Sequence, residues 1–495
     1  MKNVKRIVAL LLALLMLVGM MAVSSAETAS NLPYVKLKYV NYGDAPADGN
    51  WDEVWAKINE MLLRDLNCEV EVEWLGSSDP LNKMSLMFAG NEEFDFAYTA
   101  NWFGYADNAQ KNAFREITAE DIAAYMPNVS KMYDENVWNQ TRVNGKIFMV
   151  PGNARQPRQH CVVILRGDLR EKYGLEKPTS LADLEVYMEK VAENEPGMDA
   201  FLTMEHIYHG LFYNNANYCY SNALGIEFFV TETEDIKLFS RQFTDNYAAF
   251  AKKAHEWYEK GFWSADAIAN DAAQTVNFNT RFIAGQTAVN IECITNVESQ
   301  AKAIVAEHPE WKPELYYLNA GNHYAYNTQT SDGTIITRES KNWERVLMVV
   351  DKLLGDPEYN RLNQFGLEGV NYELDENGLY SQLEIFNPGC NWNYNNVDTK
   401  FLPKDSYEGV AEIQAQIAED CVVHPMMSIV LDKSAVETEY ASVMAVHSEY
   451  ERAFLYGMYD DTEAALEEYR MALKAAGIDE LIAEFQRQVD EYFAK

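Results

Sequence analysis

An alternation of strand-like and helix-like segments near the N-terminus most constrains what this chain can fold into. Short apolar or alternating runs suit strands, and the longer segments between them carry apolar residues at helical spacing. The predicted elements, in order, are strand 35–40, helix 51–66, strand 69–75, helix 80–89 and strand 94–98. A β-α-β-α-β series implies a parallel sheet with right-handed crossovers. Gly90 is expected to end the second helix in a left-handed conformation.

Polar and aromatic residues follow each of these strands, in loops 41–44, 76–78 and 99–105. The carboxyl ends of parallel strands share one edge of a sheet, and open α/β sheets bind their ligands at that edge. From loop placement alone, we expect Tyr42 and Asn101 to contact a ligand.

Further candidate binding residues lie in the rest of the chain. Segment 151–160 is polar and locally basic, and is predicted to be the first passage between two lobes. Its Arg155 either forms an ion pair between lobes or donates hydrogen bonds to a ligand. Segments 208–220 and 387–396 are rich in Asn, Tyr and Trp, and rings with polar edges suit the flat faces and hydroxyls of sugars. They contribute the candidates Asn215, Tyr218 and Trp392.

Size, charge and the N-terminus bound the possible functions. A chain of 495 residues should form two or more compact units, and a formal net charge of −35 disfavours binding to nucleic acid or anionic lipid. Basic residues precede an apolar run, 7–23, and small residues at 24–26, which predicts a signal peptide over residues 1–26. The alternative is an uncleaved anchor. The first cysteine is Cys68, so the leader supplies no lipid-anchor cysteine, and we expect an exported, extracytoplasmic protein.

Motif searches return no catalytic centre. The nucleophile elbow, the phosphate loop and the dinucleotide-binding glycine motif are absent, and the six cysteines are scattered without a C-x-x-C pair. We therefore predict no catalytic residue, no metal site and no cofactor, and expect most cysteines to be buried and free. A secreted glycoside hydrolase using two cleft carboxylates remains an alternative.

Five segments, taken in order, resemble one family, the extracellular solute-binding proteins of ABC importers. They are KMSLMFAGNEEFDFAYTANW, RVNGKIFMVP, ILRGDLREKYGLEKPTSLADL, FNTRFIAGQTAVNI and ITRESKNWERVLMVVDKLLGDPEYNRLNQFGLEGVNYEL. The likeness is to the group of maltose- and oligosaccharide-binding proteins. The helical tail ending KAAGIDELIAEFQRQVDEYF is similar to a subgroup with a characteristic C-terminal domain.

The resemblance implies an α/β, two-lobe periplasmic-binding-protein-like fold of type II, with a cleft and a hinge. We expect lobe I over 34–150 and 318–362, and lobe II over 151–317 and 363–495. By position, Trp102 becomes a stacking residue and Glu292 falls near the cleft loop of lobe II. The implied function is a non-enzymatic, monomeric receptor that captures a carbohydrate, expected to be an oligosaccharide, and delivers it to ABC permease subunits. A peptide- or signal-binding module is the other alternative.

Overall fold

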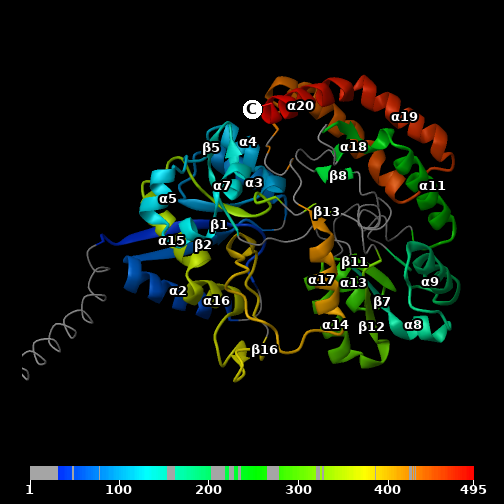
Figure 1. Cartoon of the computed structure of the whole chain (residues 1–495), viewed down its shortest axis with the longest axis horizontal. Coiled ribbons are helices and arrows are strands. Elements are labelled where there is room, and N and C mark those ends of the chain that lie inside the picture. The colour runs from blue at the N-terminus through cyan, green and yellow to red at the C-terminus, as the bar shows by residue number, and fades with distance from the viewer. Residues whose placement is uncertain are drawn as a thin grey trace, which may run out of the picture. The chain divides into compact units, whose positions relative to one another are not determined.

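The structure is a computed structural model, and the chain divides into two compact units (Figure 1). The first comprises Met1–Ala154 and Gln329–Leu402, and the second Arg155–Thr328 and Pro403–Lys495. The structure describes residues 32–46, 50–76, 78–152, 162–201, 218–221, 228–231, 236–264, 278–318, 324–325, 328–384, 386–422, 426, 429 and 431–494.

The first unit is built on a five-stranded sheet with the order β2-β1-β3-β14-β6. Its strands are β1 (Val35–Asn41), β2 (Cys68–Trp74), β3 (Phe96–Thr99), β14 (Gly333–Ile336) and β6 (Met149–Pro151). The first three run parallel, as the β-α-β-α-β pattern predicts, while β14 pairs antiparallel with both β3 and β6. Because β14 runs against β3, its beginning lies at the carboxyl end of β3, with Gly333 opposite Thr99.

Helices surround this sheet, and several are the ones that the sequence predicts. Helix α2 (Trp51–Leu66) buries Val54, Ile58 and Leu62, which recur at helical spacing. The other elements of the unit are α3 (Pro80–Ala89), η2 (Asn101–Phe103), α4 (Tyr105–Gln110), α5 (Ala119–Tyr125), α6 (Val129–Met132), α7 (Glu135–Gln140), β4 (Arg142–Val143), β5 (Lys146–Ile147), α15 (Trp343–Gly355), α16 (Pro357–Phe365), β15 (Tyr372–Leu374), β16 (Tyr380–Gln382) and η6 (Trp392–Tyr394).

One local expectation about a turn is wrong. Helix α3 does end at Ala89, but Gly90 keeps a right-handed conformation with φ −78°. The next residue, Asn91, has the left-handed conformation, with φ 51°. Asparagine is among the few residues other than glycine that adopt it readily, so the turn needed no glycine.

The second unit contains a three-stranded sheet whose centre is β7 (Val162–Arg166). Its partners β11 (Val289–Glu292) and β12 (Pro313–Tyr316) both run antiparallel to it. Val163 and Leu165 join one apolar cluster, while Val162 and Ile164 join another on the opposite face. A strand covered on both faces explains why this run is apolar throughout.

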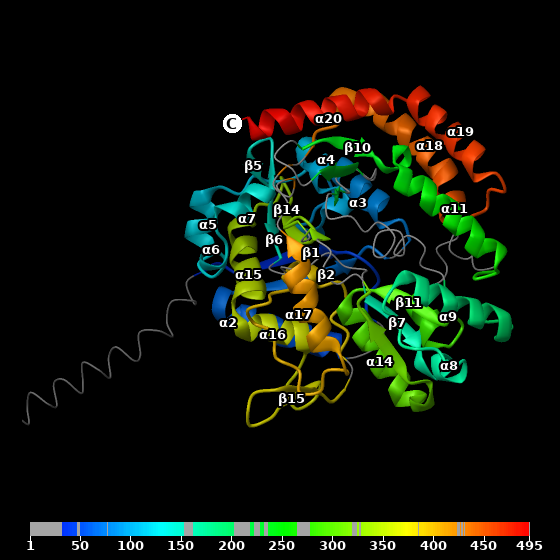
Figure 2. The ribbon, with the colours of Figure 1, turned by 45° about the vertical axis from the view of Figure 1, so that its right-hand side comes forward.

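The C-terminal helices complete the larger of these two clusters. Leu473, Leu481 and Phe485 are buried members of the same apolar cluster as Val163 and Leu165, so the tail belongs to the core of the second unit. Figure 2 shows α11, α18, α19 and α20 side by side. The elements of the unit are α8 (Gly167–Lys172), α9 (Leu181–Asn194), β8 (Tyr218–Ser221), β9 (Phe228–Thr231), β10 (Leu238–Ser240), η4 (Arg241–Phe243), α11 (Asp245–Glu259), α13 (Phe278–Ile283), α14 (Ile294–Glu307), η5 (Pro309–Trp311), β13 (Tyr324–Ala325), α17 (Val410–Asp420), β17 (Cys421–Val422), η8 (Ser434–Val436), α18 (Glu437–Leu455), α19 (Thr462–Ala475) and α20 (Ile478–Phe493).

The unit boundaries differ from those expected. Residues 318–328 lie in the second unit, and 363–402 lie in the first. Segment 363–402 belongs to the first unit because its Asn-rich loop, 387–396, is bonded to the first sheet. The Asn393 amide donates to the Tyr39 hydroxyl (3.0 Å) and to Thr334 Oγ1 (2.8 Å). These buried bonds join the loop to β1 and β14 of the first sheet.

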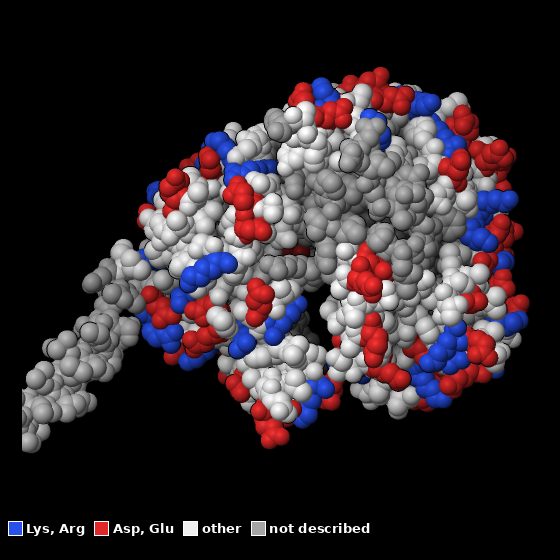
Figure 3. All heavy atoms as spheres, viewed as in Figure 1, with Lys and Arg blue, Asp and Glu red and all other residues white. Residues whose placement is uncertain are grey.

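Surface charge and cysteine state complete the description. On the described part of the face in Figure 3, basic side chains stand singly or in small groups beside acidic ones. Within the described residues, no helix is both long and apolar enough to cross a membrane. Cys68, Cys293, Cys390 and Cys421 are free thiols, and the first two are buried. Cys161 and the predicted signal peptide lie outside the described residues.

Candidate functional site

The first component of the candidate site is the turn that follows β1. Asn41 is buried at the end of the strand, and its Oδ1 accepts hydrogen bonds from the Tyr42 backbone N–H (2.9 Å) and from the Tyr39 hydroxyl (3.1 Å). The turn is thereby fixed from beneath. The Tyr42 ring is left only partly buried at the carboxyl edge of the sheet.

The second component is the 3-10 turn η2, which follows β3 directly. The Asn101 Oδ1 accepts from the Trp102 backbone N–H (2.8 Å), and the Trp102 indole N–H donates to the Ser331 carbonyl (3.0 Å). Gly104 ends the turn with φ 74°, a left-handed conformation that suits glycine. These bonds hold the indole in one orientation while 45% of Trp102 remains exposed.

The third component is Trp392, which begins the short turn η6. It is 46% exposed, although its neighbours Asn391, Asn393 and Tyr394 are almost fully buried. Asn391 donates to Asn363 Oδ1 (2.9 Å), and the Tyr394 carbonyl accepts from the Asn360 amide (2.7 Å). The side chains of Asn391 and Asn393 therefore anchor the loop to the rest of the first unit.

Tyr42, Trp102 and Trp392 come from three separate stretches of chain and meet in one group, here called the aromatic cluster. The Tyr42 ring centroid lies 5.3 Å from that of Trp102, edge to face, and 6.0 Å from that of Trp392. The two indoles are 6.3 Å apart and inclined at 58°. Exposed rings that touch one another form an apolar patch, and such a patch marks a candidate interaction site where a single exposed ring does not. The inclination makes the two indoles a bent, continuous surface for a flat ligand, and leaves no slot between them.

An acid and a second tyrosine lie at the base of the aromatic cluster. The Tyr98 ring is 6.0 Å from Trp102 and 6.3 Å from Trp392, and its hydroxyl donates to Asp332 Oδ1 (2.5 Å). Burial raises the pKa of Asp332 to about 6, and the bond from Tyr98 offsets part of that rise. Burial also raises the pKa of the nearby Cys390 thiol to about 11. At neutral pH the base of the cluster thus holds an ionised carboxylate beside uncharged groups.

Four of the eight residues predicted from the sequence lie together here, namely Tyr42, Asn101, Trp102 and Trp392. Glu292 lies in the second unit at the end of β11, where its Oε2 accepts from the Cys293 backbone N–H (2.9 Å) at the start of α14. Tyr218 begins β8, but its side chain lies outside what the structure describes. Arg155 and Asn215 also fall outside the described residues, so their roles remain predictions.

Tyr98 and Asp332 were missed by sequence reasoning. Tyr98 belongs to an apolar strand and was read as core, and Asp332 precedes a distant strand. A strand that pairs antiparallel with β3 must begin at the carboxyl edge of β3, which would have pointed to Asp332 had the direction of β14 been known. The direction of β14 could not be read from its residues, so this signal was not available in practice.

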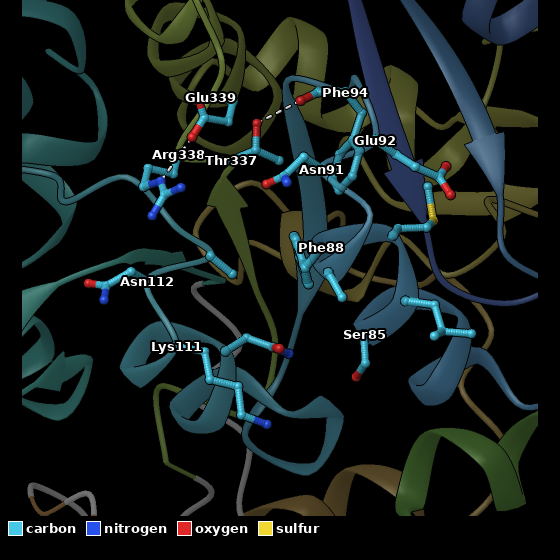
Figure 4. Close-up of a pocket in the computed structure, with 15 residues that line it drawn as sticks. Ser85, Phe88, Asn91, Glu92, Phe94, Lys111, Asn112, Thr337, Arg338 and Glu339 are labelled. Atoms are coloured by element: carbon cyan, nitrogen blue, oxygen red, sulfur yellow. Dashed lines mark hydrogen bonds and ion pairs between the residues drawn. The ribbon is translucent and has the colours of Figure 1, made fainter.

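A hollow of about 460 Å³ lies at the opposite edge of the same sheet. Figure 4 shows Phe88 and Ser85 of α3, Lys111 after α4, and Thr337 to Glu339 after β14 around it. Two of the polar groups there have partners in the lining: Thr337 donates to the Phe94 carbonyl (2.6 Å), and Arg338 pairs with Glu339 (2.9 Å). Within the described chain, no group of three or more His, Cys, Asp or Glu side chains could hold a metal ion.

Known proteins resemble this chain along nearly its whole length. A carbohydrate ABC transporter substrate-binding protein of Streptococcus pneumoniae serotype 4 (strain ATCC BAA-334 / TIGR4) is 24% identical over 487 residues, covering 94% of this chain and 92% of that protein. A protein-family profile described as a domain of unknown function, DUF3502, matches residues 425–494, which supply the helices of the C-terminal core.

Solved structures share the fold. The N-glycan transport solute binding protein NgtS from Streptococcus pneumoniae superposes with a TM-score of 0.75 at 22% identity, covering 93% of this chain and 99% of that one. The alginate-binding protein AlgQ2 superposes with a TM-score of 0.69 at 16% identity, with coverage of 93% and 99%. The expected two-domain α/β fold of solute-binding proteins is therefore confirmed, as is the resemblance read from the five sequence segments.

Proposed function

We propose that this chain is the extracytoplasmic substrate-binding component of a carbohydrate ABC importer. In this role it captures an oligosaccharide on the aromatic cluster and delivers it to the permease subunits in the membrane. The observation that carries the proposal is the exposure of Trp102 and Trp392, two indoles fixed in place by hydrogen bonds at the carboxyl edge of the first sheet. Sugar rings present flat C–H faces, and indoles are the side chains best suited to stack against them.

What the relatives bind supports the ligand class. The pneumococcal relative is a carbohydrate ABC transporter substrate-binding protein, and NgtS is also known in complex with Man1GlcNAc. Two inclined indoles 6.3 Å apart can each cover a different sugar ring, which favours an oligosaccharide over a monosaccharide. Export through the predicted signal peptide, action as a monomer and the absence of catalysis belong to the same proposal.

Isothermal titration calorimetry against neutral and acidic oligosaccharides, with peptides as a second panel, tests this function. We expect binding of at least one oligosaccharide, and loss of roughly 10- to 100-fold in affinity in Trp102→Ala. Tyr34→Ala is the matched control, because Tyr34 is 53% exposed but precedes β1 at the opposite edge of the sheet. Binding of peptides alone would contradict the proposal, and release of reducing sugar from a bound glycan would reinstate the hydrolase alternative.

A further inference from the structure

Asp332 is an acidic residue near the aromatic cluster, and the proposed function gives it no role. It directly precedes β14, and its backbone carbonyl accepts from the Gly152 N–H (2.9 Å), so its main chain is held by the strand end of β6. Its side chain is held through one oxygen only, because Oδ1 accepts from the Tyr98 hydroxyl. The carboxylate therefore has a defined direction beneath the aromatic cluster.

The second oxygen, Oδ2, is not engaged. Among the residues that the structure describes, no donor bonds to Oδ2 and no lysine, arginine or histidine forms an ion pair with Asp332. Asp332 is only partly buried, and Oδ2 is not among the fully buried polar atoms that lack a partner, so this oxygen is open to a further donor. An accessible carboxylate oxygen in a rigid frame can exchange a hydrogen bond from water for one from a ligand.

The titratable groups next to Asp332 are uncharged near neutral pH, so its carboxylate supplies the negative charge at the base of the cluster. Tyr98 and Tyr42 have pKa values raised by burial, and so has Cys390, whose thiol pKa is about 11. These three groups stay uncharged at pH 7. Asp44 lies farther out in the exposed part of the loop after β1, where it adds a second negative charge.

We propose that Asp332 Oδ2 accepts hydrogen bonds from hydroxyl groups of the sugar bound on the aromatic cluster, and that it makes the site selective for neutral over acidic oligosaccharides. The inference rests on the proposed function. An ionised acceptor forms stronger hydrogen bonds to O–H donors than a neutral acceptor does. A sugar bearing its own carboxylate would place like charges together in a partly buried site, which opposes binding.

The test compares the whole protein with its Asp332→Asn variant by titration calorimetry at pH 7.5. The probes are neutral gluco-, manno- and fructo-oligosaccharides and oligouronates of the same lengths. The wild type should bind a neutral oligosaccharide at least tenfold more tightly than any oligouronate. Asp332→Asn should lose roughly tenfold or more for the neutral ligand, because an amide can present its NH₂ group where Oδ2 stood. Glu339→Gln, an acid at the opposite sheet edge, is the matched control and should change nothing.

A pH series separates an acceptor role from a packing role. Protonation of Asp332 weakens its acceptor strength, so wild-type affinity should fall several-fold between pH 7 and pH 5, around the pKa of about 6. The Asp332→Asn variant should show no such fall. Tyr98→Phe removes the donor to Oδ1 and should move the wild-type profile to higher pH.

The possible outcomes distinguish a failure of the role of Asp332 from a failure of the proposed receptor function. If a glycan binds, is lost in Trp102→Ala and is unaffected by Asp332→Asn, the role of Asp332 is overturned and the receptor function stands. A wild-type preference for oligouronates overturns the selectivity. If no oligosaccharide binds at any pH, both the function and the inference fall.

Discussion

Two aspartates lie at opposite edges of the sheet in the first unit, and they differ in how fully their carboxylates are bonded. Asp95 stands before β3, and three donors reach it: the Lys38 backbone N–H (3.0 Å), Ser340 Oγ (2.6 Å) and the Asn342 amide (3.2 Å). Asp332 stands before β14 and receives one, from Tyr98. Asp95 is buried, and its hydrogen bonds join the start of β3 to β1 and to the segment after β14. Asp332, in contrast, has one carboxylate oxygen that accepts no hydrogen bond from the described residues.

The aromatic residues at the two edges differ in the same way. Near the hollow of Figure 4, Phe88 packs against Phe94 (5.6 Å) and Phe114 (5.3 Å), and both of these partners are buried. At the other edge the rings also touch one another, yet both indoles remain nearly half exposed. The two edges therefore differ in the exposure of their rings, and we assign the binding surface to the edge that carries the exposed indoles. Volume alone would have selected the wrong edge.

The largest expected effect follows from removing both indoles. The double variant Trp102→Ala/Trp392→Ala should weaken oligosaccharide binding by at least 100-fold, roughly 3–5 kcal/mol, because the ligand loses both stacking surfaces. Since both side chains are nearly half exposed, the melting temperature should change little. Titration calorimetry and thermal unfolding check the two parts, and retained affinity would show that the ligand binds elsewhere.

Asp95→Ala should act on stability and leave affinity alone. The substitution leaves the Lys38 N–H, the Ser340 hydroxyl and the Asn342 amide without their acceptor in a partly buried place. The loss should lower the free energy of unfolding by about 2–3 kcal/mol. A lower melting temperature with an unchanged dissociation constant is the expected result. A change in affinity comparable to that of Asp332→Asn would erase the contrast between the two edges.

Asp332→Asn should have the opposite effect on stability. The pKa of Asp332 is raised from 3.8 to about 6 in the folded chain, so folding disfavours its ionised form. Stability therefore falls as pH rises from about 4 to 6, and the loss persists above that range. Replacing the acid should raise stability at pH 7 by about 1–2 kcal/mol and leave it unchanged near pH 4. Thermal unfolding at both pH values measures this, and a destabilised variant at pH 7 would contradict it.

The smallest effect on binding is expected at the hollow. Phe88→Ala enlarges the existing hollow between α3 and the segments that follow α4 and β14, and it should cost about 1–3 kcal/mol of stability, because Phe88 is only partly buried. The dissociation constant for the oligosaccharide should stay within twofold. A larger change would make the hollow part of the binding apparatus.

Much of the fold could be read from local patterns. Helix α2 has the predicted bounds, because its apolar face has a clear period and its neighbours are strands. The Asn144-Gly145 turn between β4 and β5 is a second case, because Asn-Gly is typical of tight hairpin turns and both residues have the positive φ that such a turn requires. Where a backbone conformation favours one or two residue types, those residues in the sequence predict the conformation.

The candidate site was only half predictable. Tyr42 and Trp102 follow predicted strands, and topology brings such residues together. Trp392 could be singled out because its loop is rich in Asn, Trp and Tyr. The loop was nevertheless assigned to the second unit, because Asn393, which anchors it to the first, bonds to residues far away in sequence. Asp332 gave no local signal, since its partner Tyr98 is equally distant.

The place of β14 in the sheet constrains how the chain is made. A ribosome-bound chain that stops before Gly333 has no strand to set between β3 and β6, so both of those strands present open backbone edges. The entire intervening stretch, from Arg155 to Thr328, must be synthesised before the first sheet closes. The chain thus carries its own delay in folding, because the first sheet closes only after the greater part of the second unit has been synthesised.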